Sequence, residues 1–416
     1  MKRTIKKLLL IFLKKLAKST VSKFKPTVIA ITGSVGKTST KEAIYAVLSG
    51  YRVVRRTALN FNNEMGVPLT ILGDWESISK PVFFFWTKVI LKSVFVLIFG
   101  KKEEYPDVLV LEYGADKQGD ISYLLSIAKP HIGIVSAIGT IPVHVENYSQ
   151  GIESVAKEKG KVITELSPSD FGILNFDDPW TDRIVSKTKS HLLTFGIKEG
   201  ANVKISRISH ILNDGKITGL GFKLEQKGTS FPVVLPDAFS ISHAYACACA
   251  VAVAEVFDIN MVDAAQEFSK KYTPVYGRSL ILDGIKNTQI IDESYNSSPL
   301  ALETTLKTIK NATYARKVAV LGDMLELGEF SIKAHELAGE LVRDCIDILI
   351  TVGPRAKFIA ERAIKKGLNK ENVFVFDEVK EAGLKLQEII KEGDLILIKG
   401  SRAIGLDSVV DEVRKM

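Results

Sequence analysis

A short glycine loop holds the residue types that bind phosphate. An apolar stretch, residues 28–31, ends at this loop, and a helical pattern begins at Lys41. Gly33 and Gly36 let backbone N–H groups close around oxyanions, and the helix directs its positive end at the same place. Lys37 would neutralise the phosphates, and Thr38 would offer its hydroxyl to Mg²⁺. The pattern predicts a nucleotide site made by Gly33, Ser34, Val35, Gly36, Lys37, Thr38 and Ser39.

Other groups that suit phosphate chemistry follow along the chain. A buried strand is expected from residue 107 and ends at Glu112, where a P-loop fold places a second Mg²⁺ ligand. His144 lies in a later loop, and Lys157 and Lys159 lie in a helical lysine cluster at residues 155–162. Taken singly, His144 fits a loop histidine and the lysines fit a solvated helix face. The spacing alone leaves these interpretations open.

The elements that must position these groups repeat a strand–helix order typical of α/β proteins. Residues 26–272 predict a P-loop central domain with a parallel sheet, extended by antiparallel strands within residues 190–236. The pattern restarts after Pro274, and residues 273–416 alternate helices with strands at 289–291, 317–321, 348–352 and 395–398. Polar residues stand at the ends of these strands, which indicates a doubly wound, Rossmann-like C-terminal domain.

Charge is concentrated at the N-terminus. Residues 1–25 contain nine Lys or Arg and no acid, so 47 basic and 48 acidic residues remain for the other 391 positions. A body so nearly neutral gives no indication of nucleic-acid binding. Three cysteines form no disulfide framework, which suits a reducing cytoplasm, and Cys247 and Cys249 are expected in the core of a small-residue helix at 244–256.

Two apolar segments could meet a membrane. In the basic arm 1–25, Leu9, Phe12, Leu13 and Leu16 fall on one helical face, the pattern of a helix lying in an anionic interface. The alternative is a terminal helix docked on its own domain. The insert 81–100 is intensely apolar, but Lys88 and Lys92 share a helical face, so an amphipathic helix is expected rather than a spanning one. It would be either a second membrane contact or an apolar cover on the protein.

Taken together, the motifs resemble the Mur ligase family, ATP-dependent amide-bond-forming ligases of peptidoglycan precursor synthesis, over residues 27–416. Within it they are most similar to members that add D-Ala-D-Ala to a UDP-N-acetylmuramoyl-tripeptide. The matching stretches are the loop 33–40, the Asn-rich segment 60–70, residues 112–121, 137–146 and 156–160, Gly277-Arg278, residues 292–299 and 321–328, His335, and 399–402.

The resemblance implies the roles of the remaining residues. Thr38 and Glu112 would hold one Mg²⁺, and His144 with a carbamylated Lys159 would hold or support a second, Lys157 being the competing assignment. Arg278 would reach the γ-phosphate, so that the catalytic groups are Lys37, Lys159, His144 and Arg278. Asp292, Tyr295 and Asn296 would contact the nucleotide, where Asp292 alone also fits a helix N-cap. The substrate would be bound by Asn62, Asn63, Lys399, Ser401 and Arg402.

Three departures from the family pattern stand out. Only about 26 residues precede the central domain, so we expect the N-terminal UDP-binding domain to be missing and UDP recognition to be reduced, replaced or supplied by a partner. Residues 237–243 replace the usual nucleotide motif before the small-residue helix, and Lys161 stands where an acid is usual. The expected protein is a monomeric cytoplasmic ligase, with a peripheral contact at the inner membrane face left open. The alternatives are a Mur-type ligase for another carboxylate–amine pair and a non-catalytic ATP-binding membrane scaffold.

Overall fold

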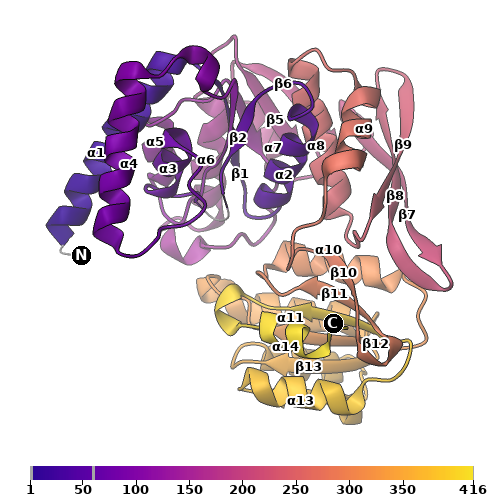
Figure 1. Ribbon diagram of the computed structural model, residues 1–416. Coiled ribbons are helices and arrows are strands. Elements are labelled where there is room, and N and C mark those ends of the chain that lie inside the picture. Colours follow the sequence, from indigo (N-terminus) through magenta and orange to yellow (C-terminus); the bar gives the residue numbers. More distant parts are fainter. Residues whose placement is uncertain (1–2, 59–60, 416) are drawn as a thin grey trace.

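Two β-sheets, each covered by helices, carry the fold (Figure 1). The computed structural model describes residues 3–58 and 61–415, so Asn60 of the predicted Asn-rich motif lies outside the described residues, as do the first two residues of the basic arm. The larger sheet has the strand order β2-β3-β1-β4-β5-β6-β7-β8-β9, and the smaller has the order β10-β11-β15-β12-β13-β14. The expected α/β class with two separate sheets is confirmed.

The larger sheet is built from the strands β1 (Thr27–Thr32), β2 (Val54–Arg56), β3 (Val108–Glu112), β4 (Ile132–Val135), β5 (Phe171–Asn175), β6 (His191–Gly196), β7 (Val203–Asn213), β8 (Lys216–Gln226) and β9 (Thr229–Pro236). Strand β1 lies between β3 and β4 and is parallel to both. Its side chains are buried on both faces, as expected for a strand inside a parallel sheet. The glycine loop therefore leaves the centre of the sheet.

Helices cover both faces of this sheet. Ile29 and Ile31 of β1 share a core with α2 (Lys37–Leu48), α8 (Ser242–Val256) and α9 (Met261–Lys271). On the other face, Val28 and Ala30 share a core with α1 (Arg3–Phe24), α3 (Gly66–Leu72), α4 (Val82–Phe99) and α5 (Asp120–Leu125). Two further helices, α6 (Ile152–Thr164) and α7 (Thr181–Val185), complete the helical layers of this sheet. Cys247 and Cys249 are buried in α8, as predicted.

The β extension differs in part from expectation. Within residues 190–236, β7, β8 and β9 are antiparallel, but β6 pairs parallel to β5 with Phe171 opposite His191. The prediction of antiparallel strands was wrong for β6, because α7 lies between β5 and β6 and returns the chain to run in the same direction. The meander β7–β9 then extends the sheet away from the glycine loop.

The smaller sheet consists of β10 (Leu280–Asp283), β11 (Gln289–Glu293), β12 (Lys317–Gly322), β13 (Ile348–Val352), β14 (Val373–Phe376) and β15 (Leu395–Lys399). All of its strands except β10 run parallel. Around it lie α10 (Pro299–Lys310), α11 (Ser331–Arg343), α12 (Lys357–Lys365), α13 (Val379–Ile389) and α14 (Asp407–Val413). The carboxyl ends of β11 and β15 point toward the larger sheet's glycine loop, which places their polar residues at the boundary between the sheets.

The N-terminal arm is a docked helix. Leu13, Leu16 and Phe24 of α1 are buried against the domain, while Phe12, predicted to share their face, is exposed. Helix α4 exposes Lys88 and Lys92, as the amphipathic pattern predicts, but Phe84, Leu91 and Phe95 are exposed beside them. Among the described residues, α4 alone is long and apolar enough to cross a membrane, judged by length and composition.

Candidate active site

The glycine loop joins β1 to α2 and is braced by the neighbouring strand. Gly33 and Gly36 have φ angles of +148° and +86°, values that side chains with a Cβ rarely adopt. Ser34 N–H donates to Ala137 O at 2.7 Å, and Ser136 Oγ donates to Val35 O at 2.6 Å. These bonds hold the loop against the residues that follow β4.

Two side chains of the loop are ready for an anion. Lys37 is half-buried and donates from Nζ to Gly33 O at 2.8 Å; desolvation lowers its pKa, an effect opposed by the Glu112 carboxylate and reinforced by the Arg278 guanidinium. Ser34 Oγ is also buried and has no hydrogen-bond partner in the part of the chain that the structure describes. A phosphate bound here would place a negative charge beside the Lys37 amine and a hydrogen-bond acceptor beside Ser34 Oγ.

Glu112, at the end of β3, meets the first turn of α2. Its Oε2 accepts a 3.1 Å hydrogen bond from Thr38 Oγ1, and its Oε1 accepts one of the same length from Asn62 Nδ2. A carboxylate and a hydroxyl are hard oxygen donors of the kind that Mg²⁺ prefers. No group of three or more His, Cys, Asp or Glu side chains among residues 3–58 and 61–415 could hold a metal ion by itself. The pair therefore fits a Mg²⁺ that completes its shell with water and phosphate oxygens.

His144 connects the two sheets across the site. Its Nδ1 lies 3.1 Å from Glu326 Oε2, a residue that follows β12, and its Nε2 lies 3.4 Å from Asp116 Oδ1. Burial lowers the pKa of His144 to about 4, although the Asp116 carboxylate acts in the opposite direction. The imidazole is therefore neutral at pH 7 and can donate from only one ring nitrogen at a time.

The two candidate lysines of α6 are in different environments. Lys159 is fully buried, and its Nζ is 3.4 Å from Ala115 O, three residues beyond Glu112. Burial, together with the charge of Lys37, lowers the pKa of Lys159 to about 7. Lys157 is exposed on the opposite side of the helix. Lys159 is thus buried close to the carboxyl end of β3, whereas Lys157 faces solvent.

Cationic and aromatic residues of the C-terminal sheet form the facing wall. The guanidinium carbons of Arg278 and Arg402 lie 4.2 and 4.7 Å from the centre of the Tyr295 ring. Lys399, at the end of β15, is buried and pairs with Glu293 Oε2 at 3.0 Å. Lys399 also donates to Asn296 O at 2.9 Å, so it holds the loop that carries Tyr295.

Asp292 lies beneath this wall. Its side chain is fully buried, and its Oδ2 accepts from Gly277 N at 2.8 Å while its Oδ1 accepts from Ser294 N and Oγ. The carboxylate thereby fixes the turn before Arg278. Asp292 is absent from the pocket lining among the described residues, and its predicted contact with the nucleotide stays a prediction.

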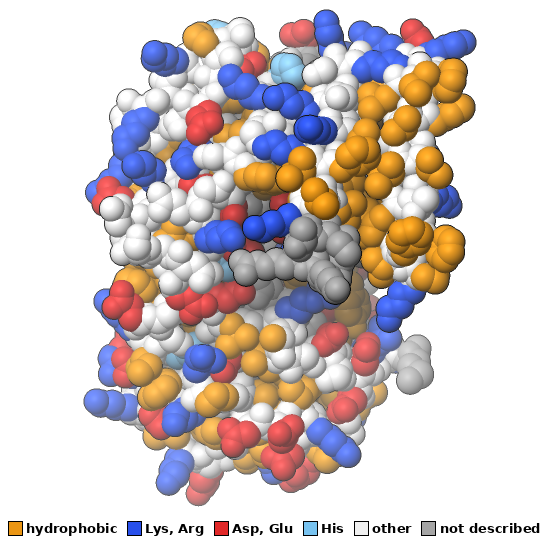
Figure 2. Space-filling model, turned by 90° about the vertical axis from the view of Figure 1, so that its left-hand side faces the viewer, with side chains coloured by type: hydrophobic (Ala, Val, Ile, Leu, Met, Phe, Trp, Pro, Cys, Tyr) orange, Lys and Arg blue, Asp and Glu red, His pale blue; other side chains and the backbone are white. Residues whose placement is uncertain are grey.

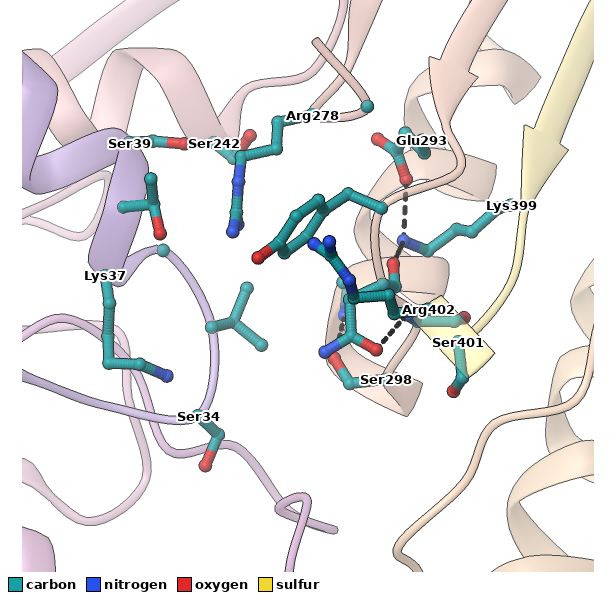
Figure 3. Close-up of a pocket in the computed structure, with 18 of the residues that line it drawn as sticks. Ser34, Lys37, Ser39, Ser242, Arg278, Glu293, Ser298, Lys399, Ser401 and Arg402 are labelled. Carbon is teal, nitrogen blue, oxygen red and sulfur yellow. Dashed lines mark hydrogen bonds and ion pairs between the residues drawn. The ribbon is translucent and has the colours of Figure 1, made fainter. Parts of the chain in front are cut away.

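Most of these groups line one cavity of about 770 Å³ (Figure 3). In Figure 3, Ser34, Lys37 and Ser39 lie on one side, Lys399, Ser401 and Arg402 lie on the other, and Arg278 extends between them. The remaining predicted site residues on its wall are Val35, Gly36, Thr38, Asn62, Asn63, Glu112, His144, Tyr295 and Asn296. Lys159 and Gly33 lie behind this wall.

Sequence reasoning missed several residues in or beside the site, among them Asp116, Ser136, Glu293 and Glu326. Asp116 and Glu326 lie within or beside motifs that the sequence singled out, but only the folded chain brings them to His144. Ser136 directly follows β4, and Glu293 ends β11. A polar residue at the end of an apolar strand was the signal that could have identified each of them.

The site belongs to a recognisable class of enzyme. Residues 31–78 and 95–251 match the Mur ligase middle domain, and residues 277–402 match the Mur ligase glutamate ligase domain. The chain therefore belongs to the Mur ligase family, whose members are ATP-dependent carboxylate–amine ligases. Within that family, several relatives share one name. The UDP-N-acetylmuramoyl-tripeptide–D-alanyl-D-alanine ligase of Bacillus subtilis is 29% identical over 408 residues, covering 96% of this chain and 79% of that protein.

Two further relatives agree. The Escherichia coli protein of the same name is 27% identical over 404 residues, covering 92% of this chain and 76% of its own length. The crystal structure of the Thermotoga maritima MurF ligase in complex with ADP has 26% identity and a TM-score of 0.78, and the match covers 97% of this chain and 83% of that one. The shared fold extends over both sheets and so over both walls of the cavity.

Proposed function

We propose that this ligase uses ATP to join D-Ala-D-Ala to a UDP-N-acetylmuramoyl-tripeptide, through an acyl phosphate, in the cytoplasm. The observation that carries the proposal is a single cavity with Lys37 and the unpartnered Ser34 Oγ on one wall and Arg278 on the other. The names of the Bacillus subtilis and Escherichia coli relatives support the substrate pair, and the ADP-bound Thermotoga maritima structure supports the nucleotide.

The reaction crowds negative charge into one place. An oxygen of the tripeptide's terminal carboxylate attacks the γ-phosphorus of ATP, and ADP leaves with the bridging oxygen. The amine nitrogen of D-Ala-D-Ala then attacks the acyl carbon, phosphate leaves, and the nitrogen loses a proton. Lys37 and Arg278 line the cavity as preorganised cations that can stabilise the transferring phosphoryl group without reorganisation. Because the two come from opposite sheets, productive binding requires both walls to be in place.

Thr38 and Glu112 would hold one Mg²⁺, and His144 would support a second; the metal would neutralise phosphate charge and polarise the phosphoryl oxygen. Lys159 would contribute as a carbamate. Its uncharged amine would add to CO₂ with loss of one proton, which gives an anionic oxygen ligand beside His144; starting from the ammonium form, two protons are lost. The lowered pKa of Lys159, about 7, supports this step because only the uncharged amine is nucleophilic.

The substrate end of the cavity would be formed by Asn62 and Asn63 together with Ser401 and Arg402, which line it on opposite sides. Recognition of the UDP-sugar by something other than the family's N-terminal domain stays a prediction, and so do the monomeric state and a location at the inner membrane face.

The test is phosphate release by the full chain with ATP, Mg²⁺, UDP-muramoyl-tripeptide and D-Ala-D-Ala, with product confirmed by mass. Release that needs both substrates supports the proposal. Release only with another carboxylate or amine identifies a Mur-type ligase of different specificity. ATP binding without release on any of these pairs indicates the non-catalytic scaffold.

A further inference from the structure

An apolar surface lies on the side of the molecule formed by α1 and α4. It consists of exposed side chains of α1 and of α4, here called the α1–α4 surface: Leu8, Ile11, Phe12, Val82, Phe83, Phe84, Leu91, Phe95, Ile98 and Phe99. Large apolar side chains this numerous on one face of a protein mark an interaction site. None of them lines the cavity between the sheets.

Helix α4 has apolar side chains on both its buried and its exposed side, and Lys88 and Lys92 also lie on the exposed side. Phe85, Trp86 and Val89 are buried and pack toward the larger sheet, while Phe84, Leu91 and Phe95 are 68%, 65% and 62% exposed. Burial of the inner side explains why the helix stays on the domain. It does not explain the outer side, because exposing large apolar side chains to water is unfavourable. Because one side is already packed on protein, α4 would lie along a membrane surface rather than cross it.

Lysines surround the apolar area. On the exposed face of α1, Lys7 precedes Leu8 and Ile11, and Lys15 follows Phe12 by one turn. Figure 2 looks at this side and shows a continuous band of hydrophobic side chains on the right, with lysine and arginine side chains at its upper and lower ends. Among the described residues, neither Lys7 nor Lys15 has an acidic partner within 4 Å.

We propose that the α1–α4 surface lies in the headgroup region of an anionic lipid bilayer, with the apolar side chains inserted and the lysines at the phosphates. Charge complementarity favours this occupant over a second copy of the chain, since paired copies would bring their lysine-rich α1 helices together. The Mur ligase middle-domain match skips residues 79–94, which hold most of α4, so the family architecture does not need this helix. The inference is independent of the substrate proposed above.

The experiment is co-sedimentation of the full chain with vesicles. Phosphatidylglycerol-containing vesicles should bind the chain more tightly than pure phosphatidylcholine vesicles do. The triple variant Phe84→Ser/Leu91→Ser/Phe95→Ser should bind roughly a hundredfold more weakly, because three large apolar side chains no longer leave water. The matched control, Leu212→Ser/Val234→Ser/Leu384→Ser, removes three side chains that are 57%, 55% and 57% exposed elsewhere, and it should bind like the parent.

A charge variant separates the electrostatic contribution to vesicle binding from the apolar one. Lys7→Gln/Lys15→Gln should lower binding to the anionic vesicles about thirtyfold and leave binding to phosphatidylcholine unchanged, at about 1 kcal/mol for each lysine near an anionic surface. Turnover of soluble substrates should be the same in all three variants, which also shows that they fold. Equal vesicle binding by the parent and the Phe84/Leu91/Phe95 variant would overturn the proposal. So would a parent dimer in sedimentation equilibrium that this variant abolishes.

Discussion

His144 Nδ1 lies 3.1 Å from Glu326 Oε2, and this contact joins the loop after β4 to the loop after β12. Nearby, a Cβ added at Gly328 would lie 2.8 Å from Glu146, so the same two loops also touch through their backbones. The histidine that resemblance assigns to a metal is thus also the contact between the two halves of the site.

Replacing Glu326 with Ala should loosen this contact. The loss of this half-exposed polar contact, at about 1 kcal/mol, predicts a kcat/KM about fivefold lower, with a larger radius of gyration in small-angle scattering as the two sheets separate. Glu329→Ala, on the same loop but exposed and outside the cavity, is the control. Unchanged scattering and unchanged kinetics in Glu326→Ala would show that the contact does not hold the domains together.

Gly33→Ala should weaken nucleotide binding. An added Cβ would stand 2.2 Å from Ser136 Oγ and 2.9 Å from Ala137 O, and φ is +148°, so the loop has to move. Strain of this kind costs about 1–3 kcal/mol, which predicts a rise of about five- to 150-fold in the Kd for ATP by calorimetry. Gly221→Ala in β8, whose Cβ would have no neighbour closer than 3.6 Å, should keep the parent affinity. An unchanged Kd in Gly33→Ala would refute the role of this loop.

Lys159→Ala should abolish turnover, on the order of a thousandfold loss, because the carbamate proposed to support the second Mg²⁺ is removed. A short carboxylate such as acetate should restore part of the rate. Lys157→Ala should keep the parent rate because that side chain is exposed. With ¹³C-bicarbonate, the carbamate signal should be present in the parent and in Lys157→Ala and absent in Lys159→Ala. The opposite pattern between the two lysines would reassign the carbamate to Lys157.

Acid should destabilise the fold through His243. This residue is fully buried, its Nδ1 lies 2.9 Å from the Tyr272 hydroxyl, and burial lowers its pKa to about 4. Between pH 4 and about 6.5, the unfolded chain binds the proton that the folded chain excludes, so stability falls as pH falls, by about 1.4 kcal/mol per pH unit. His144 and His335 shift in the same direction. The free energy of unfolding, measured with urea, should therefore differ less between pH 5 and pH 7 for His243→Asn than for the parent. Equal differences would exclude His243 as a source of the acid sensitivity.

Local patterns were enough to predict much of the fold. The apolar residues of β1, β3, β12, β13 and β15 are buried on both faces, which is a strong signal in a parallel sheet, and β1, β3 and β15 end in Thr32, Glu112 and Lys399. Strands β10 and β14 were missed because each has four residues and neither is fully buried. The direction of β6 depends on α7, a five-residue helix with too few residues for a periodic signal.

The site could be predicted only where its residues are close in sequence. Lys37 and Thr38 follow from one loop, and both line the cavity. The partners of His144 come from segments 28 residues before it and 182 residues after it, and no local pattern links them. Likewise, the choice between Lys157 and Lys159 depends on which face of α6 is buried, and two residues of spacing turn the helix far enough to separate them.

Helix α3 connects two parts of the molecule that have separate tasks. Asn63 Oδ1 accepts from the N–H groups of Met65 and Gly66 at its start, and its Leu69 shares a core with Leu13 of α1. A lipid surface that rotates α1 has to displace α3 and the amide side chain at its tip. Membrane composition would then tune how fast the enzyme works, in addition to where it resides.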